Sequence, residues 1–442
     1  MVSLRLGSVC LVAPLLLALT LAAFTPQPMQ DETTASYKER VNRIRQLGKS
    51  DPEAIPQLAP YLSDPDRDIR VEAVKAIVRL DTERSLDPLI KATSDSDPEV
   101  EIRATDGIVN FYDPGYVAKS GLTGSFTKGF RQIKGFFAKR NDEIIDPGIT
   151  VRPDVALALG RLAASNSDSQ VRANAALAAG ILRARPAVPG LIDALQSKKS
   201  DIIFECLVAF QKIGDRSAGP RVAFLANDFD ERVQTTALET IGVLTSTDSA
   251  PEVRRALNGA KNNRVRRAAL GALAMMALPE DRPLFNQYLS DRDAGVRAAA
   301  LEGLGGIREP EDYPALEAAY NEPDADPSVH LAAAYALVNE GKLDTSEFSP
   351  LRYLIENLDS KARGDDAQRY LTLVCRRPDV RKAIIPLLPS ATKDEKVALC
   401  WALAESHGPD VIPALQSMSN DIDPSVSLTA AKALKIVMAS RP

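Results

Sequence analysis

The sequence predicts an all-helical protein built as an α-solenoid, a superhelix of stacked helical hairpins. A short pattern recurs about every 31 residues, and apolar residues within it fall at i, i+3, i+4 and i+7, as amphipathic helices require. Ala and Leu are abundant, whereas aromatic residues make up only 5% of the chain. One such hairpin cannot bury its apolar face alone, but a stack can. We therefore expect about eleven units of about 31 residues, with one insertion of about 40 residues.

The N-terminal residues 1–23 resemble a secretory signal peptide. Arg5 precedes an apolar core, "VCLVAPLLLALTLAA", and Thr20-Leu21-Ala22 offers a small-residue cleavage site. The core is shorter than the roughly 20 residues that a spanning helix needs, although an uncleaved anchor is the alternative. Residues 24–36 then form a flexible lead-in. We expect an exported protein, periplasmic or secreted, and the lack of any Asn-x-Ser/Thr site favours a bacterial one.

The repeat is set by an aliphatic anchor that follows a turn, often with Arg next to it. The pattern appears in "DRDIRVEAVKAIVRL", "SQVRANAALAAGILR" and "AGVRAAALEGLGGIR", and a second helical segment such as "AVPGLIDALQS" separates successive anchors. Ala recurs four residues after many anchors, where a small side chain lets helices approach closely: Ala73, Ala104, Ala237, Ala269, Ala300, Ala333 and Ala430. The anchors themselves are Ile69, Val100, Val171, Ile202, Val233, Val265, Val296, Val329 and Val426.

The repeats fall into two blocks. Residues 37–112 hold a capping helix, "YKERVNRIRQLGKS", and the first repeats, and residues 151–442 hold the rest. The long interval between Val329 and Val426 has room for two more degenerate units. A turn Asp or Asn, then Val-Arg, then Ala and Leu at helical spacing resembles the HEAT repeat in its short bacterial, PBS-lyase HEAT-like form. That resemblance implies a binding scaffold for varied partners, and some relatives attach or detach bilins.

The turns before the anchors are rich in Asp. Asp64, Asp66 and Asp68 alternate like calcium ligands, but the Gly and the distal Glu of a calcium loop are missing. Asp at such a place caps the free N–H groups of the following helix. We favour capping. Four arginines follow anchors and favour an Arg–Asp ladder between units over a groove for an anionic partner: Arg70, Arg172, Arg266 and Arg297.

The sequence offers no catalytic or metal-binding motif. His330 and His407 are the only histidines, and neither has a His or Cys neighbour at metal-ligand spacing. Beyond the N-terminal core the cysteines are Cys206, Cys375 and Cys400, which we interpret as buried side chains, with a Cys375–Cys400 bridge as an alternative. We expect no enzyme activity and no cofactor, and the net charge of −5 argues against a nucleic-acid binder.

Residues 113–150 interrupt the repeat with a basic, aromatic insertion. It begins at Asp113-Pro114-Gly115 and carries Asp146-Pro147-Gly148 near its end, and Asp-Pro-Gly favours turns. On a helix, "SFTKGFRQIKGFFAKRND" is amphipathic, and it can pack on the solenoid, dock into a partner or lie on an anionic membrane surface. The predicted binding residues here are Phe126, Lys128, Phe130, Arg131, Ile133, Lys134, Phe136, Phe137, Lys139 and Arg140.

Two further aromatic residues are candidate contacts for a partner. Tyr335 and Trp401, the only Trp, occupy similar places in their units, where they either fill core volume or anchor a peptide on the concave face. We expect the second helices to form that face. The function predicted from the sequence is a non-enzymatic scaffold of the bacterial envelope for a protein or peptide. The alternatives are a membrane-surface adaptor and a bilin-lyase-like enzyme.

Overall fold

The computed structural model describes residues 36–119, 144–146 and 148–439. Within these ranges every regular element is a helix, which confirms the all-helical prediction. None of these helices is both long and apolar enough to cross a bilayer.

The anchors lie on a layer of long helices that stack on one another in chain order. All nine anchor residues are buried, with exposed fractions of 3% or less, and so are the Ala residues four positions later. The layer begins with the capping helix α1 (Tyr37–Leu47). It continues with α3 (Arg67–Leu80), α5 (Pro98–Tyr112), α9 (Ser169–Ile181), α11 (Ser200–Ile213), α13 (Glu231–Val243), α15 (Asn263–Met276), α17 (Ala294–Ile307), α19 (Pro327–Asn339), α21 (Gly364–Val374), α23 (Lys393–Glu405) and α25 (Pro424–Ala439).

A second layer of mostly shorter helices covers one side of the anchor helices. Several have Pro in the first turn, as at Pro189, Pro251 and Pro413, where the missing N–H would be unpaired in any case. These helices are α2 (Ile55–Leu58), α4 (Glu83–Ala92), α8 (Pro153–Ser165), α10 (Val188–Ala194), α12 (Gly219–Val222), α14 (Ala250–Asn258), α16 (Arg282–Tyr288), α18 (Tyr313–Tyr320), α20 (Pro350–Glu356), α22 (Pro378–Ile384) and α24 (Ile412–Met418).

Short 3-10 helices lead into or extend the helices of the second layer. They are η2 (Pro52–Ala54), η3 (Ala59–Ser63), η6 (Arg185–Ala187), η7 (Arg216–Ala218), η8 (Ala223–Asn227), η9 (Thr247–Ser249), η10 (Pro279–Asp281), η11 (Pro310–Asp312), η12 (Asn357–Asp359), η13 (Ile385–Ser390) and η14 (Pro409–Val411).

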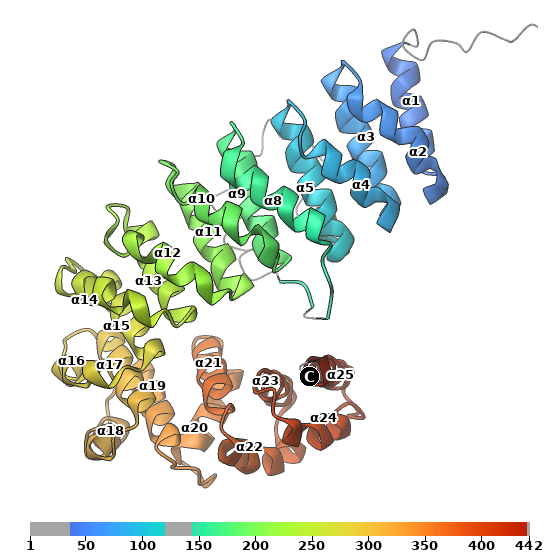
Figure 1. Cartoon of the computed structure of the whole chain (residues 1–442). Helices are drawn as coiled ribbons and strands as arrows, with labels where there is room; N and C mark the ends of the chain where they lie inside the picture. Colours follow the sequence, from blue (N-terminus) through green and yellow to red (C-terminus); the bar gives the residue numbers. More distant parts are fainter. Residues whose placement is uncertain (1–35, 120–143, 147, 440–442) are drawn as a thin grey trace, which may run out of the picture.

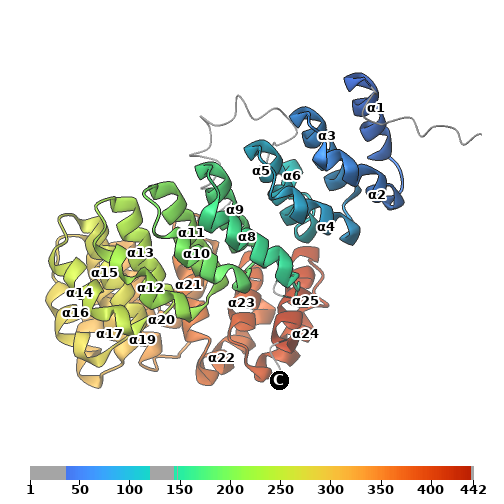
Figure 2. The same cartoon turned by 45° about the horizontal axis from the view of Figure 1, so that its top comes forward.

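The stacked units curve into an open arc (Figure 1), and a tilted view shows them as one continuous array from α1 to α25 (Figure 2). In the C-terminal half, α17, α19, α23 and α25 lie on the inside of the curve, whereas α16, α18, α22 and α24 lie outside (Figure 1). In this half the anchor helices therefore line the concave side. The sequence-based expectation that the intervening second helices form it is wrong, because those helices pack on the outer side of the anchor layer.

Glycine sets the spacing between several anchor helices. A Cβ built at Gly305 would lie 2.5 Å from Cα of Ala336 on the next anchor helix, far inside van der Waals contact. The glycine lies nine positions after the anchor of its helix, and the alanine lies seven positions after the anchor of the next helix. Residues at these two positions make the same close contact in two other places, Gly180 with Ala209 and Gly242 with Ala272. Between α11 and α13 the equivalent pair is Gln211 and Thr240, whose side chains form a 2.9 Å hydrogen bond instead.

The solenoid is continuous across the insertion. α9 packs directly on α5, and α8 resumes the outer layer. At the first Asp-Pro-Gly, Gly115 has a φ of +93°, and the short α6 (Tyr116–Lys119) follows. At the second, the Ile149 N–H donates to the Asp146 carbonyl, which closes a turn. The Ile145 N–H donates to the Ile181 carbonyl at the end of α9, so the returning chain is tied to the array there.

Candidate binding surfaces

The acidic turns before the anchor helices are built from paired hydrogen bonds. In the turn at residues 64–66, the Asp64 carboxylate accepts from the Asp66 N–H at 2.9 Å, and the Asp66 carboxylate accepts from the Asp68 N–H at 2.9 Å. The turns at residues 95–97, 228–230 and 421–423 repeat this arrangement. The second Asp is thus the helix N-cap, which confirms the capping prediction. Among the described residues no group of three or more His, Cys, Asp or Glu side chains is placed to hold a metal ion.

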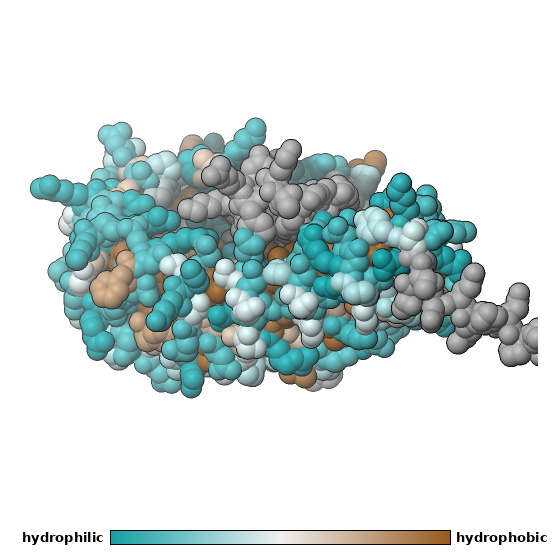
Figure 3. Space-filling model, turned by 90° about the horizontal axis from the view of Figure 1, so that it is seen from above, coloured by the Kyte–Doolittle hydropathy of each residue, from teal (hydrophilic) through white to brown (hydrophobic). Residues whose placement is uncertain are grey.

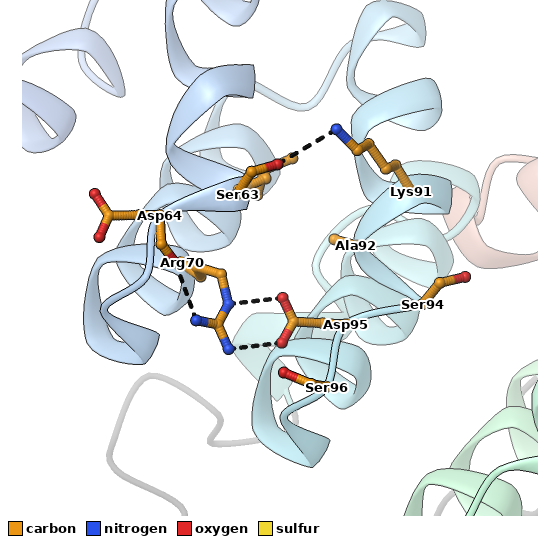
Figure 4. Close-up of a pocket in the computed structure, with 9 residues that line it drawn as sticks. Ser63, Asp64, Arg70, Lys91, Ala92, Ser94, Asp95 and Ser96 are labelled. Carbon is orange, nitrogen blue, oxygen red and sulfur yellow. Dashed lines mark hydrogen bonds and ion pairs between the residues drawn. The ribbon is translucent and has the colours of Figure 1, made fainter. Parts of the chain in front are cut away.

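The first Asp of a turn joins its unit to the one before. The guanidinium of Arg70 on α3 donates to both carboxylate oxygens of Asp95 in the next unit, at 2.7 and 2.8 Å (Figure 4). It also donates to the carbonyl of Asp64 at 3.0 Å. Arg40 pairs with Asp64 in the same way. A hollow of about 320 Å³ lies beside Arg70 and Asp95 and is bordered by Lys91 (Figure 4). The arginine of this hollow is held by Asp95, and its second cation, Lys91, donates to the Ser63 hydroxyl at 3.4 Å.

The four arginines of the predicted ladder divide into two groups. Arg70 forms the ladder contact, and Arg266 approaches Asp291 of the next unit at 3.9 Å. Arg172 instead donates to the backbone carbonyl of Ala163 in the last turn of α8, and Arg297 donates to that of Asp291 in the turn before α17. For these two the ladder prediction is wrong. Beyond Arg172 the equivalent turn reads Ser197-Lys198-Lys199, which offers no carboxylate.

At the junction beside the insertion, a different pair of side chains occupies the two ladder positions. Glu101 on α5 takes the place of the arginine, and Asn166 takes the place of the turn Asp. The Asn166 amide donates to Glu101 at 2.7 Å, so two carboxylates do not face each other. Burial raises the pKa of Glu101 to about 7, and the nearby Asp95, Asp168 and Asp97 act in the same direction. The ladder position therefore holds a carboxyl that titrates near neutral pH.

The base of the insertion is closed by contacts from both flanks. The Arg152 N–H donates to the Tyr112 hydroxyl at 3.1 Å, and the Arg152 guanidinium lies 2.6 Å from Asp87 on α4. Tyr116 and Ile145 are buried, with exposed fractions of 1% and 5%. The ten predicted binding residues of the insertion, from Phe126 to Arg140, lie outside the described residues, as do the signal-peptide segment and residues 24–35 of the lead-in.

The concave side of α17 to α21 carries a charged and aromatic group, which we call the concave cluster: Glu302, Tyr335, Arg369 and Tyr370. The Arg369 guanidinium donates to both Glu302 oxygens, at 3.1 and 2.5 Å, and the Tyr370 hydroxyl donates to the same carboxylate. The Arg369 guanidinium also lies 4.4 Å from the centre of the Tyr370 ring. This network joins α17 to α21 across the intervening α19, so no repeat-to-repeat pattern in the sequence could have indicated it.

Of the two predicted aromatic anchors, Tyr335 belongs to the core. It is 8% exposed and stacks on Tyr370 with ring centres 4.8 Å apart. Burial raises its pKa to about 12. Trp401, on α23, is half-buried against the core and keeps part of its surface in solvent. The core interpretation therefore describes Tyr335, and Trp401 remains available as a contact.

Two exposed apolar side chains lie on neighbouring anchor helices. Val243 at the end of α13 is 45% exposed, and Met275 on α15 is 36% exposed and lies beside Gly242 of α13. Because outer helices cover the other side of this layer, both mark its concave side. The face of the molecule seen in Figure 3 is predominantly hydrophilic with scattered apolar patches.

The remaining candidate residues, the two histidines and three cysteines, have structural roles. His330 lies between Tyr320 and Tyr353, with ring centres 4.5 and 4.3 Å away, and it stacks on the Tyr353 ring. His407 lies in a turn with a φ of +52°. Cys206, Cys375 and Cys400 are buried free thiols, so the alternative of a Cys375–Cys400 bridge is wrong. Burial raises the pKa of all three, which makes them poor nucleophiles.

Comparison with known families matches this repeat. The family model described as HEAT repeats matches residues 32–108, 219–285 and 279–338. Over these residues the chain matches HEAT repeats. Its anchor helices with their Val-Arg and Ala positions are the inner helices of these repeats. Comparison with curated proteins finds no match.

Several solved structures are similar to these HEAT repeats. An engineered protein is 20% identical, with 90% of this chain and 99% of that chain covered and a TM-score of 0.35. The protein YIBA_ECOLI is 16% identical, with 69% and 97% covered and a TM-score of 0.38. The complex of CpcE and CpcF of phycocyanin lyase from Nostoc sp. PCC7120 is 20% identical, with 68% and 91% covered and a TM-score of 0.30. None of the three bears on what this chain binds.

Proposed function

We propose that this HEAT-repeat chain is a non-enzymatic scaffold that binds a protein or peptide along its concave face, and that it works in the bacterial cell envelope. The observation that carries the binding role is Arg369, which stands partly exposed in the concave cluster with its guanidinium held by Glu302. The envelope role rests on the signal-peptide pattern of residues 1–23.

Arg369 is suited to recognition because its position is fixed before a partner arrives. Two contacts to Glu302 and the Tyr370 ring orient the guanidinium, while 36% of the side chain stays in solvent. Glu302 uses one face of the guanidinium fork, and an arginine has five N–H donors, so donors remain for a carboxylate or carbonyl of a partner. Arginine and aromatic side chains commonly dominate binding energy at interfaces.

The apolar part of the same surface lies further towards the N-terminus. Val243 and Met275 expose apolar area on neighbouring anchor helices, and Trp401 does so beyond the concave cluster. A peptide laid along the groove would thus meet apolar contacts at both ends and a charged group between them. Methionine adapts to varied partners because its side chain is unbranched and polarisable.

We include the insertion, residues 113–150, as a second contact region that extends or gates this surface. Its basic and aromatic composition supports that role, and its flanks are tied to α5, α8 and α9.

Affinity capture from an envelope extract, with three matched variants, tests the proposal. Met275→Glu and Arg369→Lys alter the concave face, whereas Phe224→Glu alters an apolar residue of η8 in the outer layer that is more exposed than Met275. We expect the first two to lose bound partner at least ten-fold and the third to retain it. Equal retention by all three variants, with unchanged circular dichroism, would refute concave binding. Salt-sensitive flotation with anionic liposomes that needs residues 120–143 would favour a membrane-surface adaptor instead.

A further inference from the structure

The Tyr335 hydroxyl in the concave cluster has no hydrogen-bond partner among the residues that the structure describes. The side chain is only 8% exposed, and its ring stacks on Tyr370. Buried hydroxyl groups are nearly always paired, so this one needs an explanation. Burial raises the pKa of Tyr335 to about 12, and the phenol therefore stays protonated and can donate a hydrogen bond.

Two arginines lie close to this hydroxyl. Burial has the largest effect on the pKa of Tyr335, but the charges of Arg369 and Arg376 both act to lower it, which requires both guanidinium groups to be nearby. The two arginines are seven positions apart, a spacing that puts them on the same side of a helix. Three groups that can donate hydrogen bonds are thus gathered on the concave surface between α19 and α21.

Arg376 differs from the other arginines that follow α21. Arg377 pairs with Asp379, and Arg381 pairs with Asp410 at 2.8 Å. The Arg376 side chain is exposed and makes no ion pair or hydrogen bond with any part of the chain that the structure describes. Since a guanidinium carries five N–H donors in a planar fork, Arg376 can offer two parallel donors to a ligand.

The surrounding charges favour a singly charged ligand. Glu302 already accepts from Arg369 and Tyr370, so the groups that remain to be paired in the cluster are donors. Glu302 itself and Asp366, which lies 3.9 Å from Arg369, would repel a doubly charged phosphate more strongly than a carboxylate. A carboxylate matches both the donor groups and the local charge.

The position of these donors in the array favours a side-chain carboxylate over a chain terminus. The inner layer continues beyond α21 with α23 and α25, so a bound segment can run past the donors in both directions. Trp401 on α23 is partly exposed and offers the next contact along that path. A chain that ended at the donors would leave this contact unoccupied.

We propose that the Tyr335 hydroxyl and the guanidinium groups of Arg369 and Arg376 form a carboxylate subsite that receives an Asp or Glu side chain of the bound partner. This inference rests on the proposed function, because the subsite lies on the same concave face, and it adds the chemical class of the group that the partner must present there.

Fluorescence anisotropy with defined peptides tests the subsite. The probes are two fluorescein-labelled, C-terminally amidated peptides of Glu, Ala and Leu, which are identical except that Gln replaces every Glu in the second. We expect the full chain to bind the Glu peptide at least ten-fold more tightly than the Gln peptide. Because both peptides are amidated, the Glu side chains supply the only carboxylates of the peptide.

Substitutions at the subsite should change this preference selectively. Arg376→Gln should abolish it, whereas Arg376→Lys, which keeps the charge but loses the planar fork, should retain part of it. Tyr335→Phe keeps the stacked ring and should weaken the preference. Arg221→Gln removes an exposed arginine of α12 in the outer layer and should leave the preference unchanged. Circular dichroism would confirm that each variant is folded.

The results that would overturn the subsite differ from those that would refute the scaffold. Equal affinity of the wild type for both peptides, or no binding of either, would overturn the proposal, as would an unchanged preference in Arg376→Gln. The proposed function would survive these results if capture from extract still depended on Met275. A preference for the Glu peptide that Arg376→Gln abolishes, with extract capture equal in all concave variants, would support the subsite and refute the scaffold role.

Discussion

The close approach of α17 and α19 at Gly305 predicts opposite effects for one substitution at two glycines. Ala at 305 would place its Cβ 2.5 Å from Cα and 2.6 Å from Cβ of Ala336, where about 3.5–4.0 Å is the favourable separation. The two helices must therefore move apart by about 1 Å. At Gly271, inside α15, an added Cβ meets nothing within 4 Å.

The magnitudes follow from two opposing contributions. Replacing Gly by Ala in a helix stabilises it by about 1 kcal/mol, and this gain applies at both positions. Overpacking costs about 1–3 kcal/mol and applies only at Gly305. Gly271→Ala should thus raise the stability by about 1 kcal/mol, and Gly305→Ala should lower it by up to about 2 kcal/mol. Since the helix contribution cancels, the difference between the variants measures the inter-unit contact.

Urea denaturation followed by circular dichroism, with hydrogen exchange of peptides from α17 and α19, provides the measurement. We expect the denaturation midpoint to rise for Gly271→Ala and fall for Gly305→Ala, with faster exchange in α17 and α19 only in the latter. Equal stabilisation of both variants would refute the close helix contact and the packing rule drawn from it.

Three further predictions concern charge and the insertion. Glu205 is buried, and burial raises its pKa to about 7, so the folded state loses stability as pH rises from about 4.5 to 7. In thermal or urea unfolding, the stability of Glu205→Gln should match that of the wild type at pH 4 and exceed it by at most about 3 kcal/mol above pH 8. The same stability difference at both pH values would contradict this. Arg70→Ala should destabilise by about 2–3 kcal/mol because it leaves a buried carboxylate unpaired, whereas Arg264→Ala, at an exposed pair, should cost less than about 0.5 kcal/mol in the same assay; similar costs would argue against the ladder. Replacing residues 120–143 with a Gly/Ser linker, which keeps Tyr116 and Ile145 in the core, should leave helix content near wild type but reduce partner capture; full capture would exclude a recognition role for the insertion.

The sequence predicted the helical array well because its signals are local and periodic. Burial of an aliphatic anchor such as Ile69, with Ala73 four residues later, follows from helical geometry alone. Capping by Asp66 likewise depends only on its own turn. These features repeat in almost every unit, so one correct interpretation extends to the whole chain.

The features that could not be predicted from the sequence depend on contacts between units. The side of the array that becomes concave is set by the packing of two layers, which no single helix encodes. Arg172 and Arg70 occupy the same repeat position, yet only Arg70 finds a carboxylate in the next turn. The pairing of Glu302 with Arg369 spans 67 positions and two units, so it leaves no periodic trace.

Site-specific photocrosslinking in the native host most directly tests the claim that the concave face binds a partner. A photoreactive phenylalanine analogue would replace Met275 on the concave side, Trp401 beyond the concave cluster, or Phe224 in the outer layer. The scaffold account predicts the same discrete adduct from Met275 and Trp401, no such adduct from Phe224, and loss of the adduct when Arg369→Lys is added. An adduct from Phe224 alone, or equal adducts from all three positions, would contradict it.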